Sequence, residues 1–68
     1  MDDDMRELSA LLGYLVKHNT EHAGEIMALA ERAKGLGKTA VYDGLVQGVN
    51  LLNGSNDCLQ AALTALEA

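Results

Sequence analysis

The 68-residue sequence has no proline, phenylalanine or tryptophan, and it has a single cysteine. One cysteine excludes an intramolecular disulfide, and nothing else in the chain suggests an oxidising compartment. A chain this short buries too little apolar surface to be comfortably stable without a disulfide, a metal ion or a partner. Because the disulfide is excluded, we expect a metal or a partner to supply the missing stability.

Basic and aromatic residues are also scarce. The formal net charge is −5, and the only aromatic residues are Tyr14 and Tyr42, so the cationic surface and stacking platforms of a nucleic-acid binder are missing. The same charge disfavours an anionic membrane surface. The segment 1–4 is acidic where a signal peptide would be basic, and no apolar run approaches the roughly 18 residues that span a bilayer. We therefore expect a cytoplasmic protein with no nucleic-acid or membrane partner.

The first half of the chain has the pattern of one long helix. Seam positions recur at alternating spacings of four and three, which is typical of a heptad. Asp4 lies at an acidic start, and Arg32 and Lys34 precede Gly35, as the helix dipole prefers. The spacing predicts a helix from about residue 4 to about residue 34. Its seam consists of Leu8, Leu12, Leu15, Asn19, His22, Ile26, Leu29 and Ala33.

Residues 35–38 then form a predicted turn, since glycines flank Leu36 and a good N-cap, Thr39, follows. So short a connection makes the helices antiparallel neighbours, and the expected fold is an all-α helical hairpin. The second helix should cover about 39–67. Its predicted seam consists of Tyr42, Leu45, Val49, Leu52, Asn56, Leu59, Leu63 and Leu66.

The composition of residues 53–57 is typical of a turn, and Ser55 could cap a short third helix after Gly54. The seam nevertheless keeps its phase through this segment. The phase favours one continuous second helix, with a bend or break at 53–55 as the alternative.

One hairpin leaves a second apolar set without cover. Exposed apolar patches of that extent usually mark an interface, so we expect a homodimer that forms a four-helix bundle. The uncovered set predicted here is Leu11, Val16 and Met27 on the first helix, with Val46, Leu51 and Ala62 on the second.

His18 and His22 stand one helical turn apart, and two imidazoles so placed can chelate a transition metal such as nickel or zinc. Glu25, one turn further, offers an oxygen ligand on the same edge, and a second subunit would complete the shell. With Glu21, the histidines also match the H-x-x-E-H spacing of inverted zinc peptidases. A two-helix chain cannot build a substrate cleft, so we expect a non-enzymatic metal-binding module.

The alternative is a purely structural or protein-interaction module. A hairpin that turns at Leu36 brings Asn19 level with about Asn53, so Asn19, His22, Asn53 and Asn56 could form a hydrogen-bonded polar layer. Such layers set register and pairing in helical bundles. The sequence leaves both readings open.

Several segments resemble an uncharacterised helical-hairpin domain of bacteria and archaea that has an H-N-x-x-H-A core. They are residues 11–12, 17–19, 21–23 and 30–33, with Asn56 before an apolar run. The sequence departs from that pattern at Gly13, Tyr14 and Gly54. Some members are appended to proteins similar to the CooT-type nickel-binding accessory proteins of carbon monoxide dehydrogenase. The resemblance implies that His18, Asn19, His22 and Asn56 form one functional or structural unit, and it brings a nickel context. A larger protein partner is a separate possibility beside the homodimer.

Overall fold

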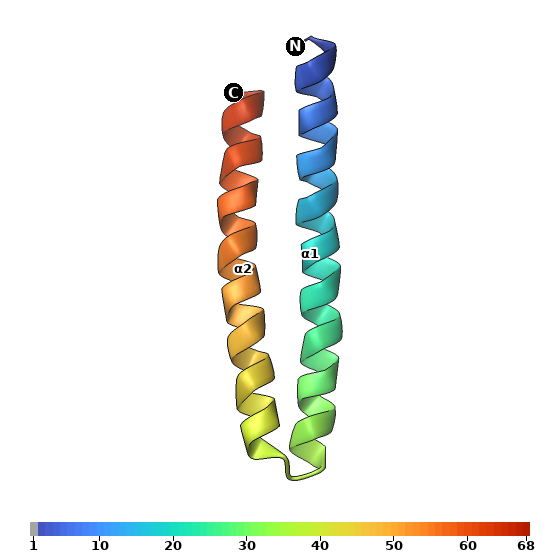
Figure 1. The fold of residues 1–68 in the computed structure, drawn as a ribbon, viewed down its shortest axis with the longest axis vertical. Coiled ribbons are helices and arrows are strands. Elements are labelled where there is room, and N and C mark those ends of the chain that lie inside the picture. The colour runs from blue at the N-terminus through green and yellow to red at the C-terminus, as the bar shows by residue number, and fades with distance from the viewer. Residues whose placement is uncertain (1) are drawn as a thin grey trace.

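The computed structural model describes residues 2–68, which form two antiparallel helices connected by a tight turn (Figure 1). Helix α1 spans Asp3–Gly35 and α2 spans Thr39–Glu67. No strand occurs in this described part, and the rod that the helices form measures 53 × 14 × 12 Å. The predicted all-α hairpin is confirmed.

Local hydrogen bonds explain where α1 begins and ends. The Asp2 carboxylate accepts a hydrogen bond from the Met5 amide at 2.8 Å, which caps the first turn. At the other end, the Lys38 amide donates to the Ala33 carbonyl at 2.9 Å and the Gly37 amide donates to the Lys34 carbonyl at 3.0 Å. This pair of bonds is a Schellman motif. Gly37 has a φ of 74°, so it is the left-handed residue that the motif requires.

Helix α2 continues without interruption through residues 53–57. The alternatives of a separate helix after Gly54 and of a break at 53–55 are therefore wrong. Gly54 has no positive φ, so its backbone does not form a turn and it lies within the continuous helix. The predicted seam of α2 is confirmed, since Val49 is buried and the other seam residues are half-buried.

Helix α1 packs against α2 through a face that differs from its predicted seam. At four of the eight predicted positions, the residue that follows faces α2 instead. The side chains turned toward α2 are Ser9, Leu12, Val16, Asn19, Ala23, Ile26, Ala30 and Ala33. Ala23, Ala30 and Ala33 are buried, whereas Leu8, Leu15, His22 and Leu29 are exposed. Small side chains let two helices approach closely, and the bulkier leucines consequently lie to one side of the contact.

The predicted uncovered set is only partly correct for the same reason. Leu11, Leu51 and Ala62 are exposed as expected, with exposed fractions of 54% for Leu11 and 69% for Leu51. Val16, Met27 and Val46 are instead half-buried between the helices. Their places on the exposed surface are taken by Leu8, Leu15, Leu29 and Val41.

Gly54→Ala should stabilise the protein by about 1 kcal/mol, because glycine is a poor helix former and alanine the best. A Cβ at position 54 would meet no atom within 4 Å. Urea denaturation followed by circular dichroism measures the change. Gly37→Ala is the control and should destabilise the protein, since its positive φ strains any residue with a Cβ. A lower midpoint for Gly54→Ala would contradict the continuous helix.

Candidate functional site

Two asparagines form a polar contact between the helices, near the middle of the rod. The Asn19 Nδ2 donates to Asn56 Oδ1 at 3.3 Å, and the Asn56 Nδ2 donates to the Val16 carbonyl at 3.0 Å. The Asn56 amide also lies 3.2 Å from the hydroxyl of Thr20. No buried side-chain nitrogen or oxygen of residues 2–68 lacks a hydrogen-bond partner. The pair is therefore satisfied, and it matches Asn19 of α1 with Asn56 of α2.

The structure brings together only half of the predicted polar layer. Asn19 and Asn56 are in contact, whereas Asn53 and His22 are exposed. The register explains why Asn53 is not the partner of Asn19, because the turn is centred between Gly37 and Lys38 rather than at Leu36. Asn19 is then level with Asn56 instead of Asn53.

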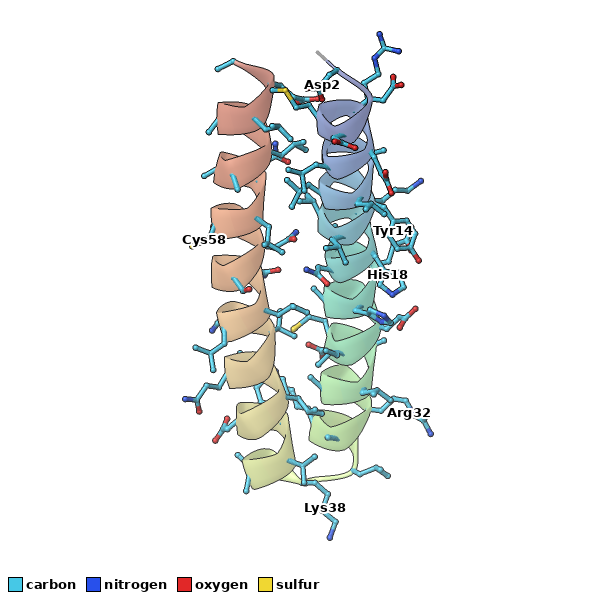
Figure 2. The ribbon with its side chains drawn as sticks, turned by 45° about the horizontal axis from the view of Figure 1, so that its top comes forward. Asp2, Tyr14, His18, Arg32, Lys38 and Cys58 are labelled. Carbon is cyan, nitrogen blue, oxygen red and sulfur yellow. The ribbon has the colours of Figure 1, made fainter. Side chains whose placement is uncertain are left out.

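The two histidines form a separate cluster on α1. Their Nε2 atoms lie 2.8 Å apart, and the Nδ1 of His22 lies 3.0 Å from the Glu25 carboxylate. The ring of Tyr14 stacks on that of His18, with centroids 5.3 Å apart and planes inclined by 15°. Figure 2 shows Tyr14 and His18 on the side of α1 that faces away from α2. A shallow pocket lies there, lined by Tyr14, Lys17, His18 and Glu21.

The geometry divides the predicted metal ligands into two kinds. Two nitrogen ligands about 2.0–2.1 Å from one ion are separated by about 2.8–3.4 Å at angles of about 90–110°. The 2.8 Å between the two Nε2 atoms is at the lower end of this range. Glu25 instead contacts the opposite nitrogen of His22. A carboxylate there orients a metal-binding imidazole from outside the coordination shell. The role of Glu25 as a ligand stays a prediction.

The chain by itself offers at most these two imidazoles. In the described residues, no three His, Cys, Asp or Glu side chains are grouped so that they could hold a metal ion. His22 was expected in the helical seam, but 48% of its side chain is exposed, because the packed face of α1 includes Ala23 instead. Cys58 is likewise exposed.

A family model matches residues 8–66, and its description is "Domain of unknown function (DUF8180)". The chain belongs to this family. The DUF8180 match includes both helices, the asparagine pair and the histidine cluster. No curated protein and no solved structure matches the chain. Within residues 2–68, neither helix of the DUF8180 domain combines the length and hydrophobicity needed to cross a membrane.

Asn56→Ala should destabilise this DUF8180 domain by about 1–3 kcal/mol, because it leaves the Asn19 amide half-buried without its partner. The double substitution Asn19→Leu, Asn56→Leu removes both partners and should cost much less or even stabilise the domain. Urea denaturation of the single and double variants measures both effects. Equal losses in Asn53→Ala and Asn56→Ala would contradict the observed register.

Proposed function

We propose that this domain is a non-enzymatic association module, which completes its core by pairing through one face of the hairpin. The observation that carries the proposal is a row of uncovered leucines on α1. Leu8, Leu11, Leu15 and Leu29 are 43% to 54% exposed, although they lie in a well-formed helix beside a packed seam. Leucines so regularly placed and so little covered are typical of an interface.

This surface, which we call the open face, also includes α2. Its positions on α1 precede the packed seam by one residue, which turns them by about 100° around the helix. The same offset on α2 gives Val41 and Leu51, the exposed large apolar residues of that helix. Two antiparallel helices are related by a pseudo-two-fold axis perpendicular to their common plane. Residues displaced by one position from the packed seam of either helix therefore lie on the same side of the hairpin. Small residues, namely Gly44, Gly48, Ala62 and Ala65, occupy other open-face positions of α2.

The energetics of the hairpin support a need for cover. Its buried apolar residues are Ala23, Ala30, Ala33 and Val49, and no large side chain of the described chain is fully buried. Covering a leucine completely contributes about 1.5–3 kcal/mol. Four half-exposed leucines on each of two copies therefore contribute on the order of 6–12 kcal/mol. Association costs about 4–15 kcal/mol in lost translational and rotational freedom, so the gain and the cost are of similar size. Helix α2 adds further apolar area to the interface.

Leu15→Glu should abolish association, because it places a charge in the centre of the leucine row. Sedimentation velocity at high micromolar concentration should show a dimer for the wild type and a monomer of 7.2 kDa for this variant. Ala28→Glu is the matched control, since Ala28 is exposed on α1 outside the open face. A folded wild-type monomer at that concentration would contradict the proposal.

Binding of a transition metal at His18 and His22 is a second candidate function. It is supported by the 2.8 Å separation of the two Nε2 atoms and by the contact of Glu25 with the remaining nitrogen of His22. Neutral imidazole is a common ligand of nickel and zinc. Two ligands give a weak site, which a second copy would strengthen by adding donors.

His18→Ala should abolish binding of nickel or zinc in calorimetry without unfolding the domain, because this side chain contributes nothing to the packed seam. Glu25→Gln should weaken binding by about tenfold or more, as expected for a carboxylate outside the coordination shell. Glu31→Gln is the control, with the same charge change at an exposed position one helix face away. Identical isotherms for wild type and His18→Ala would eliminate this site.

A further inference from the structure

Four of the exposed leucines are arranged symmetrically about His22. Leu8, Leu15, His22, Leu29 and Leu36 follow one another at intervals of seven residues. When a second α1 lies antiparallel, with His22 opposite His22, its Leu29 and Leu36 are level with Leu15 and Leu8 of the first. The row is therefore complementary to a reversed copy of itself.

The charges at the two ends of the hairpin favour the same orientation. The end that holds the termini has acidic Asp2, Asp3, Asp4, Glu7 and Glu67 against one base, Arg6, a balance of −4. The turn end has Arg32, Lys34 and Lys38 against Glu31 and Asp43, a balance of +1. Reversing the second copy places each strongly acidic end beside a basic turn. Keeping the ends together would instead place two acidic ends side by side, which costs energy even though salt screens exposed charges.

The polar side chains of the open face also find partners in this arrangement. With His22 at the centre, Glu25 of each copy lies within one residue, about 1.5 Å along the axis, of the level of His18 of the other. Glu25 already contacts His22 through one carboxylate oxygen, and His22 contacts His18. The carboxylate of Glu25 then lies near His18 of the second copy. A polar layer can be buried at low cost only when its members are paired in this way.

From these three observations, we infer that the open face binds a second copy of this chain in antiparallel orientation, with a two-fold axis beside His22. The inference rests on the proposed association function and specifies its partner, orientation and register. It also joins the two histidine pairs into one layer of four imidazoles and two carboxylates. The pair of His18 and His22 is thus half of a site that the second copy completes.

Disulfide cross-linking tests the orientation. In a Cys58→Ser background, the double variant Leu15→Cys, Leu29→Cys should form a covalent dimer under mild oxidation, because position 15 of one copy is level with position 29 of the other. Either single variant should form about tenfold less, since its own two cysteines would be about 21 Å apart along the helices, far beyond the reach of a disulfide. His22→Cys removes no leucine and should cross-link by itself.

Three results would overturn the inference. Single variants that cross-link as well as the double variant would show a parallel pair. In a chain that keeps Cys58, a cross-link between Leu15→Cys and Cys58, together with no cross-link in the double variant, would show that α2 of the second copy covers α1. No cross-link in either the double variant or His22→Cys, in protein that sediments as a dimer, would place the interface elsewhere while the association function stands. Failure of the wild type to dimerise would instead remove the proposed function as well.

Discussion

The close contact between the alanines of α1 and helix α2 decides the arrangement of the other side chains. Ala23, Ala30 and Ala33 are buried in the half of the hairpin nearest the turn, where the connection already holds the helices together. Once these small residues face α2, the leucines one position before the seam cannot face it too, because one residue corresponds to about 100° of rotation. The hairpin therefore has a packed seam of small and medium-sized side chains and a second, uncovered row of large ones.

The sequence was sufficient to predict both helices, the turn and the seam of α2. It was insufficient for α1, because two overlapping heptads run through that helix and share Leu12, Asn19, Ile26 and Ala33. Periodicity selects the more hydrophobic heptad, with Leu8, Leu15, His22 and Leu29, whereas α2 contacts the one with more alanines. Hydrophobicity identifies residues that avoid water, and the pattern alone does not say which partner covers them.

Register was the other quantity that the pattern left undetermined. A turn centred at Leu36 and one centred between Gly37 and Lys38 leave the helix boundaries almost unchanged, yet they exchange Asn53 for Asn56 as the partner of Asn19. The Schellman hydrogen bonds from Lys38 and Gly37 decide between them. His18 and Asn19 are likewise adjacent in the sequence but belong to different faces, so the predicted single polar group separates into an asparagine pair and a histidine cluster.

Because the hairpin buries only small apolar side chains, its integrity under the proposed pairing is tied to its own abundance. Association that is specific to the folded state stabilises that state by mass action, and dilution shifts the equilibrium toward single hairpins with bare leucines. Such hairpins open more readily and expose more cleavable backbone to proteases. Under this pairing, the exposed row of leucines on α1 makes the stability of each copy depend on the concentration of the others.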